Sequence, residues 1–319
     1  MARVSSSGTL PFDDPAVQLA HRTAIRSIER VVAEVVPPTE PAAALRRVAE
    51  LFAGGGVLVI TGAGVSTDSG IPDYRGPRGS LTRHRPMTFQ EFRHHPAAAR
   101  RYWARSYVGW RVMTAAAPNR THFALAELEG AGLVDHLVTQ NVDGLHLAAG
   151  SRRVTPLHGD LAQVICLDCG RGEDRRELDR RFAAANPGFL ERVSLDPAAV
   201  NPDGDVVLPE TMVEEFHMVG CLACGSKRLK PDVVYFGESV PAVRKQAAAD
   251  AAARARAVVT VGTSLAVMSR YRLVLDAARR GVPIAVVNGG PSRADAKAEV
   301  VWRTGVAPAF DAVLDALEL

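Results

Sequence analysis

Short runs of branched apolar residues alternate along this 319-residue chain with longer segments whose apolar positions recur at helical spacing. Short apolar runs bounded by turn residues are typical of buried parallel strands. Such strands are expected at 57–60, 133–139, 154–157, 233–238, 258–261, 284–287 and 300–302. Helices are expected at 41–52, 96–114, 119–129, 241–255, 270–280 and 308–319, with a short one capped by Thr88. This alternation predicts an α/β fold with a doubly wound parallel sheet.

The first of these strands ends in a glycine turn that suits a phosphate. Val57–Ile60 is followed by Gly62-Ala63-Gly64, where bare backbone lets a ligand approach closely. A helix is expected to begin at Val65-Ser66-Thr67, and its free N–H groups would favour an anion. The next segment, 71–76, contains proline and glycine and is expected to be a loop. This order predicts a nucleotide pyrophosphate site.

The dinucleotide fingerprint G-x-G-x-x-G is only half met. Gly62 and Gly64 fit it, but Thr67 occupies the third glycine position. No acidic residue ends a second strand about 20 residues later, where the fingerprint places a ribose ligand. A plain glycine turn between a core strand and a helix remains the alternative. The pattern favours a Rossmann-like nucleotide fold that is not an ordinary dehydrogenase.

Polar residues also follow other predicted strands. The segments are Gln140-Asn141-Val142-Asp143, Gly262-Thr263-Ser264 and Asn288-Gly289-Gly290. Carboxyl ends of strands are where open α/β sheets bind ligands, and Asn288 is the candidate for a ribose hydroxyl. The alternative for Asn141 or Asp143 is a cap on the following helix. His158 follows a strand and precedes a glycine, and its imidazole is a candidate base at neutral pH.

Four cysteines form two C-x-x-C pairs, Cys166/Cys169 and Cys221/Cys224, separated by 51 residues. Two such pairs complete a tetrahedral shell with no open position, which predicts one structural Zn²⁺. Redox use is the alternative. The module is expected at 161–230, inserted in a larger domain made of 41–160 and 231–319 and preceded by an extension over 1–40.

Composition narrows the functional classes only mildly. Hydrophobic residues make up 47% and charged residues 23%, as in ordinary globular proteins. The net charge of +3 comes from 38 basic and 35 acidic residues, which does not favour nucleic acid as a partner. No apolar run is long enough to span a bilayer, and the first residues lack the apolar stretch of a secretion signal. We therefore expect a cytoplasmic protein with neither nucleic acid nor membrane as partner.

Taken together, the motifs resemble those of the sirtuin family over about residues 45–315. They stand in the family's order: Gly62–Ser66, Gly70–Arg75, Thr139–Asp143, His158-Gly159, the cysteine pairs, Val234–Glu238, Gly262–Ser264 and Asn288. The segments 101–105, 109–110, 139–146 and 202–205 and the long cysteine spacer resemble the class II branch, which includes the mitochondrial sirtuin 4.

The resemblance implies NAD-dependent removal of an acyl group from a lysine side chain. In that chemistry NAD is consumed: nicotinamide leaves, and the acyl group ends on ADP-ribose. By correspondence, His158 is the base, and Asn141 and Asp143 hold ribose and nicotinamide. The cofactor contacts implied by the resemblance or by position at a strand end are Gly62, Ala63, Gly64, Ser66, Asp73, Tyr74, Arg75, Gln140, Val142, Gly262, Thr263, Ser264, Asn288, Gly289, Gly290 and Val306.

The resemblance also implies an apolar tunnel for acyl-lysine, formed by Val234 and Phe236, with Gly237 and Glu238 on the same peptide-binding segment. The Tyr-x-x-Arg clamp of desuccinylating sirtuins is missing from the loop 81–86, which leaves the acyl preference open. Two other functions stay open at this point. One is an ADP-ribosyltransferase or NAD glycohydrolase, and the other is a non-catalytic NAD sensor. Oligomeric state is not predicted.

Overall fold

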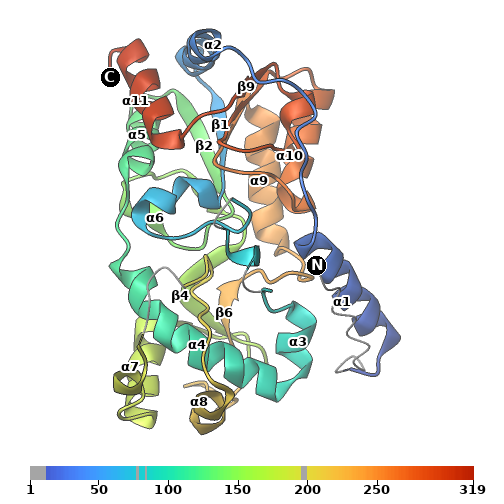
Figure 1. Cartoon of the computed structure of the whole chain (residues 1–319), viewed down its shortest axis with the longest axis vertical. Coiled ribbons are helices and arrows are strands. Elements are labelled where there is room, and N and C mark those ends of the chain that lie inside the picture. The colour runs from blue at the N-terminus through green and yellow to red at the C-terminus, as the bar shows by residue number, and fades with distance from the viewer. Residues whose placement is uncertain (1–11, 77–78, 83–84, 195–199) are drawn as a thin grey trace.

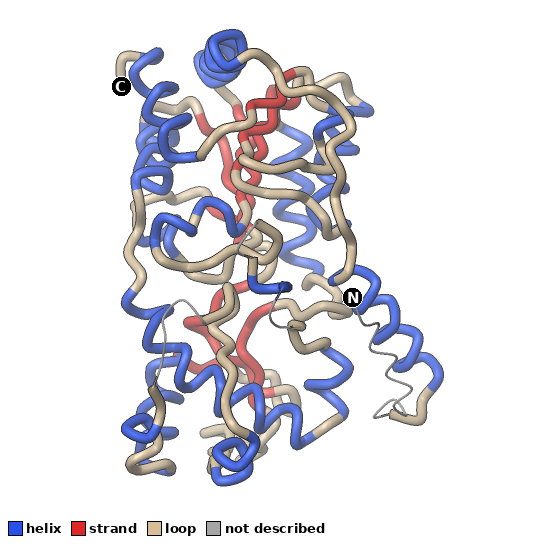
Figure 2. The backbone as a smooth tube through the Cα atoms, in the orientation of Figure 1, coloured by secondary structure: helices blue, strands red, loops and turns tan. Residues whose placement is uncertain are grey.

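The computed structural model describes residues 12–76, 79–82, 85–194 and 200–319 of the chain. Two parts follow one another along the long axis of the molecule (Figure 1). One part contains a six-stranded parallel sheet, and the other contains a three-stranded antiparallel sheet. Loops and turns gather between the two sheets (Figure 2).

The larger sheet has the strand order β3-β2-β1-β7-β8-β9. Every pairing in it is parallel. Its strands are β1 (Val57–Thr61), β2 (Val134–Thr139), β3 (Val154–Pro156), β7 (Ala257–Val261), β8 (Ile284–Val287) and β9 (Val300–Trp302). The central strand β1 is buried along its whole length, as its continuous apolar run predicted.

Helices cover both faces of this sheet. The side chains of Val57 and Val59 pack with α2 (Pro41–Ala53), α5 (Arg120–Gly130) and α11 (Val306–Leu317). Those of Leu58 and Ile60 pack on the other face with α9 (Ala242–Arg254) and α10 (Met268–Arg279). Because successive residues of a strand point to opposite faces, one apolar run serves two cores. The predicted doubly wound sheet is confirmed.

The smaller part has an aromatic core. Its sheet has the order β5-β4-β6, with β5 (Gly172–Asp174), β4 (Gly159–Cys166) and β6 (Leu229–Val233). The indole N–H of Trp103 donates to the carbonyl of Leu229 over 2.8 Å, and the guanidinium of buried Arg175 lies 4.7 Å from the Trp103 ring centroid. The helices that contribute residues to this core include α4 (Pro96–Ala115), α7 (Arg175–Ala185) and α8 (Glu210–Glu215).

The predicted boundaries of the two parts remain a proposal, and we propose one change to them. The predicted range 41–160 places helices α3 (Phe89–His94) and α4 in the larger part. Their residues Phe92, Tyr102 and Tyr107 share the aromatic core of the smaller part. The N-terminal helix α1 (Pro15–Ile28) lies beside α3 (Figure 1). It is joined to α3 where the His21 ring meets the Thr88 hydroxyl at 3.0 Å.

Several elements differ from their prediction, and α10, like α11, begins two residues early. The helix expected at Val65–Thr67 is replaced by two 3-10 turns, η1 (Ala63–Val65) and η2 (Thr67–Ser69), which end at Gly70 with a φ of 83°. The strand expected at 233–238 ends at Val233, because β6 pairs with β4 and the chain then turns at Gly237, whose φ is 83°. Helix α11 begins two residues before its predicted start, because Pro308 fits a first helical turn.

The remaining described elements are short. They are η3 (Ser80–Thr82), α6 (Leu145–Ala148), η4 (Leu190–Arg192) and η6 (Asp295–Lys297). Thr88 caps α3 with a complete capping box, as predicted. Among the described residues, none of the helices has the length and apolar character that crossing a membrane requires.

The contact between α4 and the loop around Gly204 gives a stability prediction. A Cβ atom on Gly109 would lie 2.0 Å from the carbonyl oxygen of Gly204. We expect Gly109→Ala to lower the free energy of unfolding by about 1–3 kcal/mol, because this overpacking forces backbone to move. Gly130→Ala is the control, since nothing lies within 4 Å of its Cβ position. Urea denaturation measures both, and equal stability of the two variants would contradict the prediction.

Candidate functional site

The candidate site lies at the carboxyl edge of the larger sheet. Strands β1 and β7 are neighbours, and the chain continues from β1 toward β2 on one side and from β7 toward β8 on the other. Such a reversal of strand order opens a crevice outside the strand ends, where α/β sheets bind ligands. The turns that follow β1, β2 and β7 meet there.

The glycine turns after β1 and β7 touch through bare backbone. The N–H of Gly64 donates to the carbonyl of Gly262 over 2.9 Å. A Cβ on Gly64 would lie 2.8 Å from that same oxygen, and one on Gly62 would lie 2.0 Å from Nε2 of Gln140. Gly262 also has a φ of 59°. No side chain fits at these positions, so a backbone cradle stands at the ligand edge, as the glycine pattern predicted.

The polar residues after β2 are linked to this cradle by hydrogen bonds. The Asn141 side-chain amide donates to the Gly62 carbonyl and to the Ser66 hydroxyl, both over 3.0 Å. Ser66 in turn donates to Oδ2 of Asp143 over 2.7 Å. Three of the predicted site residues therefore form one network in which each orients the next.

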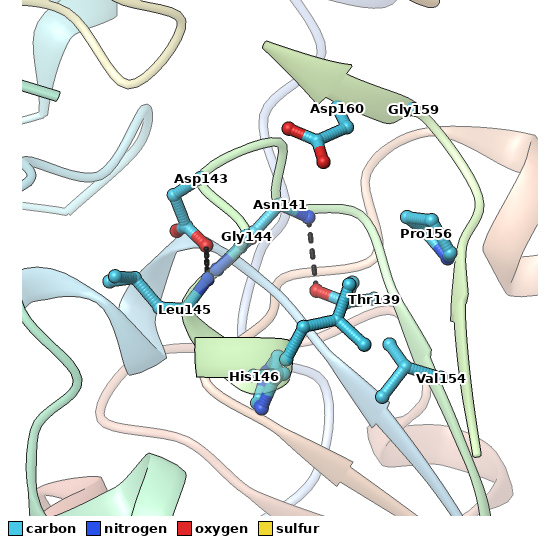
Figure 3. Close-up of a pocket in the computed structure, with 11 residues that line it drawn as sticks. Thr139, Asn141, Asp143, Gly144, Leu145, His146, Val154, Pro156, Gly159 and Asp160 are labelled. Carbon is cyan, nitrogen blue, oxygen red and sulfur yellow. Dashed lines mark hydrogen bonds between the residues drawn. The ribbon is translucent and has the colours of Figure 1, made fainter. Parts of the chain in front are cut away.

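Asp143 uses both carboxylate oxygens in local hydrogen bonds. Its Oδ1 accepts the N–H of Leu145 over 2.9 Å, so it caps α6, while Oδ2 holds Ser66. Burial raises the pKa of Asp143, and the bonds from Leu145 and Ser66 partly offset that rise. Figure 3 shows the hollow beside the network, which is lined by Asn141, Asp143, Gly159 and Asp160 among others. The residues next to His158 thus face the same hollow as the network.

His158 stands between β3 and β4, half-buried and close to cations. Its backbone carbonyl accepts the N–H of Val234 over 2.8 Å. Nε2 of the ring lies 3.3 Å from the Ser269 hydroxyl, and Nη1 of Arg270 lies 3.4 Å from each ring nitrogen. Burial, together with the charges of Arg270 and Arg244, lowers the pKa of His158 well below 6.5. The imidazole is therefore neutral at physiological pH and able to accept a proton.

The loop over the cradle is tied to the N-terminal helix. Asp73 accepts the N–H of Gly76 over 2.9 Å, which closes a tight turn. The guanidinium of Arg75 donates to the carbonyls of Ser27 and Ile28 at the end of α1, each over 3.2 Å. The ring of Tyr74 meets that of Phe236 edge-on at 6.3 Å. This last contact brings the loop to the segment predicted to bind the peptide.

The segment 234–238 is held mainly by α3. The carbonyl of Phe236 accepts the N–H of Phe89 over 2.9 Å, and that of Gly237 accepts from the Gln90 side chain over 3.1 Å. Glu238 forms an ion pair of 3.1 Å with Lys230, whose side chain is 5% exposed. Sequence analysis did not identify Lys230, because nothing in its local pattern indicated burial.

Other predicted contacts occupy the same edge without joining the Asn141 network. Nε2 of Gln140 donates to Thr263 over 3.2 Å, while the buried Oε1 of Gln140 has no partner. The Asn288 amide donates to the Gly290 carbonyl over 2.6 Å. Val306 is buried in the first turn of α11. The cradle and the orphaned Gln140 oxygen fit a polar ligand such as a dinucleotide.

Sequence analysis missed Ser269 and Arg270, the two side chains that contact the His158 ring. A signal was available, however. Arg270 is the third residue of α10, which follows the Gly262-Thr263-Ser264 turn. The positive end of the helix dipole disfavours a cation in the first turn, so an arginine there indicates a role outside the helix.

The four cysteines form a separate metal centre in the smaller part. Their ligand atoms all lie within 4.8 Å of one another. The Cys166–Cys224 and Cys169–Cys221 sulfur pairs are 3.7 Å apart. A tetrahedron with Zn–S bonds of about 2.3 Å has edges of about 3.8 Å. The sulfur spacing therefore suits the predicted structural Zn²⁺, with all four positions supplied by the chain.

We expect the metal to stabilise the smaller part without taking part in the chemistry. Purified protein should contain one zinc per chain by elemental analysis, and Cys169→Ser should lose that zinc and unfold at a lower temperature. The control is Ser226→Ala. Ser226 is not one of the four cysteine ligands but lies beside the cluster, where its hydroxyl donates to Asp168. Full zinc content in Cys169→Ser would contradict the four-cysteine site.

Comparison with known proteins agrees with this geometry. The model of the Sir2 family matches residues 62–269. NAD-dependent protein deacetylase 1 of Corynebacterium efficiens is 61% identical over 280 residues, which cover 88% of this chain and 100% of that protein. The human NAD-dependent protein lipoamidase sirtuin-4, mitochondrial, is 44% identical over 75% of this chain and 76% of its own length.

A solved structure described as Sir2-p53 peptide-NAD+ has the same fold. It matches with a TM-score of 0.67 and 28% identity, covering 86% of this chain and 98% of its own. The family match extends from the Gly62 turn to Ser269 beside His158, and so contains both the cradle and the candidate base. This protein therefore belongs to the Sir2 family.

Proposed function

We propose that this protein is an NAD-dependent protein-lysine deacylase that produces nicotinamide and O-acyl-ADP-ribose. The observation that carries the proposal is a half-buried, neutral His158 beside the hydrogen-bonded network of Asn141, Ser66 and Asp143. A base and a fixed set of polar groups at the ligand edge are what displacement at a ribose carbon requires. The relatives' names support the same activity.

The residues that would hold NAD follow from the cradle. The backbone at Gly62, Gly64 and Gly262 would receive the pyrophosphate, since no side chain covers it. Asn141 and Asp143 would orient ribose and nicotinamide, because Ser66 and the Leu145 N–H fix their side chains. The wider set proposed to contact NAD is Ala63, Asp73, Tyr74, Arg75, Gln140, Val142, Thr263, Ser264, Asn288, Gly289, Gly290 and Val306. NAD supplies an electrophilic ribose carbon when nicotinamide leaves.

The chain's own groups would then move one proton and exclude water. His158 accepts the proton from a ribose hydroxyl at a ring nitrogen, for which its lowered pKa keeps the lone pair free. Val234 and Phe236 would line the passage for the acyl-lysine chain, and Gly237 and Glu238 would lie along the peptide. Those two are already anchored by Gln90 and Lys230, so the peptide would meet a preformed strand-like segment.

We further propose that the protein acts in the cytoplasm on acyl-lysine proteins. Four cysteines arranged for a metal, with no disulfide among them, suit a reducing compartment.

The first test is NAD-dependent loss of acyl groups from peptides carrying acetyl-, lipoyl-, longer fatty acyl- and succinyl-lysine. His158→Ala should lower kcat/KM by about 10²–10⁴-fold, the usual contribution of a general base. His217→Ala is the matched control, since His217 is exposed and remote from the cradle in sequence. Nicotinamide release is followed in the same reactions.

Two outcomes would favour a function other than lysine deacylation. Nicotinamide release without acyl loss from any peptide would favour an ADP-ribosyltransferase or NAD glycohydrolase. NAD binding with neither reaction would favour a sensor. Equal activity of His158→Ala and wild type would remove His158 from its proposed role.

The lowered pKa of His158 also predicts a pH profile. The neutral imidazole is the active form, and it is lost only as pH falls through the lowered pKa. We therefore expect the acid limb of kcat/KM to lie well below pH 6.5. Arg270→Gln should move that limb upward, though not fully to 6.5, because burial is the larger cause. An acid limb at 6.5 in the wild type would contradict the assignment.

A further inference from the structure

Arg270 is a buried cation at the catalytic base. It is 4% exposed, and its Nη1 atom lies 3.4 Å from both ring nitrogens of His158. Ser269 lies 3.3 Å from Nε2 of the same ring. Any group that reaches a ring nitrogen of His158 must therefore contact Arg270 or displace it.

Arg270 has no anionic partner. Its Nε atom makes no hydrogen bond, and no carboxylate among the residues that the structure describes forms an ion pair with it. The ionisable groups whose charge acts on it are Arg75, which lowers its pKa, and Tyr74, which raises it; burial is the largest influence, and the pKa falls to about 9. Arg270 also stands at the positive end of α10, which adds to the unfavourable field.

Three other cations near it or equally buried have a carboxylate or an aromatic face, and Arg75 donates to the carbonyls of Ser27 and Ile28. Arg244, whose charge acts on His158, is paired with Asp232. Lys230 is paired with Glu238. Arg175 lies against the Trp103 and Trp110 rings and donates to the Ser106 carbonyl over 3.1 Å. Among these, only Arg270 is left buried with neither a carboxylate nor an aromatic face.

A buried charge without a partner is costly, and an incoming anion relieves that cost. The anion that reaches Arg270 comes with the molecule that reaches His158. Phosphates of NAD are assigned to the glycine cradle, and no hydrogen bond links Arg270 to Gly62, Gly64 or Gly262. The acyl group, in contrast, must come close to the base during its transfer. A carboxylate two or three carbons beyond the acyl carbonyl is short enough to lie against a guanidinium that touches the base.

We propose that Arg270 receives the terminal carboxylate of a dicarboxylic acyl group on lysine, such as succinyl or glutaryl, and selects this class of substrate. The proposal rests on the proposed deacylase function. A guanidinium donates two parallel hydrogen bonds to a carboxylate, which gives it both strength and direction. Arg270 would supply this recognition from the start of α10.

The test compares peptides that differ only in charge at the end of the acyl group. Succinyl-lysine is compared with its neutral amide, and glutaryl-lysine with its neutral amide. All four peptides have the same sequence, which contains no other acidic residue. Reactions are run at pH 8, where His158 is neutral, for wild type, Arg270→Gln and Arg272→Gln. Arg272 is the matched control, because it is an exposed arginine on the same helix.

Wild type should prefer each carboxylate over its amide by about tenfold or more in kcat/KM, as expected for a hydrogen bond to a charged group. Arg270→Gln should lose that preference, so that its loss of kcat/KM is about tenfold or more greater on the carboxylate peptides than on the amide peptides, and Arg272→Gln should keep the preference. A fluorescent peptide without NAD should show the same preference in Kd, again lost only in Arg270→Gln.

Four results would overturn the proposal. They are no preference in wild type, an equal loss on carboxylate and amide peptides in Arg270→Gln, a preference that survives Arg270→Gln, or a change confined to the KM for NAD. An equal loss on both kinds of peptide would make Arg270 a positioning residue for His158. A change confined to the KM for NAD would indicate that the anion bound by Arg270 belongs to NAD. Acyl loss from amide or acetyl peptides separates failure of this proposal from failure of the deacylase function. If no peptide reacts at all, the Kd of the fluorescent peptides still shows whether Arg270 binds the carboxylate.

Discussion

The site depends on the close approach of two backbone turns at the ends of β1 and β7. Gly64 and Gly262 are joined by a hydrogen bond of 2.9 Å, and a methyl group on Gly64 would lie 2.8 Å from the Gly262 carbonyl oxygen. A side chain at either position would separate the strand ends. Because Asn141 is hydrogen-bonded to the Gly62 carbonyl, the polar network after β2 takes its position from this same contact. The close packing of the two glycine turns is thus the primary constraint, and the positions of the polar groups depend on it.

One set of hydrogen bonds ties the local fold to the groups proposed to hold the ligand. Asp143 caps α6 with one oxygen and fixes Ser66 with the other. Ser66 is fully buried and also accepts from Asn141, so neither neighbour needs to reorganise when a ligand arrives. Groups fixed before the reaction stabilise developing charge better than groups that must turn toward it. The hydrogen bond that Asp143 accepts from Leu145 is therefore compatible with the ligand contact proposed for it.

The parts of the site that lie at strand ends could be predicted from sequence, and the parts that depend on packing between elements could not. Gly62, Asn141 and Gly262 follow three parallel strands, and parallel strands must end at one edge. The four cysteines carry their geometry in their spacing. By contrast, the 3-10 turns at 63–69 arise where Gly70 adopts a positive φ, which the local pattern does not reveal. Residues 234–236 leave the strand because β6 pairs with β4 in the other part of the molecule.

Burial acts on His158 and Arg270 in the same direction, yet it leaves the first neutral and the second still charged at physiological pH. It is the largest cause of the lowered pKa of His158, which falls well below 6.5, and of Arg270, which falls to about 9. Between those two values the base is neutral while the guanidinium is still protonated. The lowered pKa suits the base proposed for His158, whereas Arg270 keeps its charge at a cost that an incoming anion would relieve. The neutral imidazole can accept a proton, and the adjacent cation remains able to hold an anion. At physiological pH the imidazole is therefore neutral because of burial, whereas the guanidinium stays protonated in spite of it, and no carboxylate among the described residues forms an ion pair with Arg270.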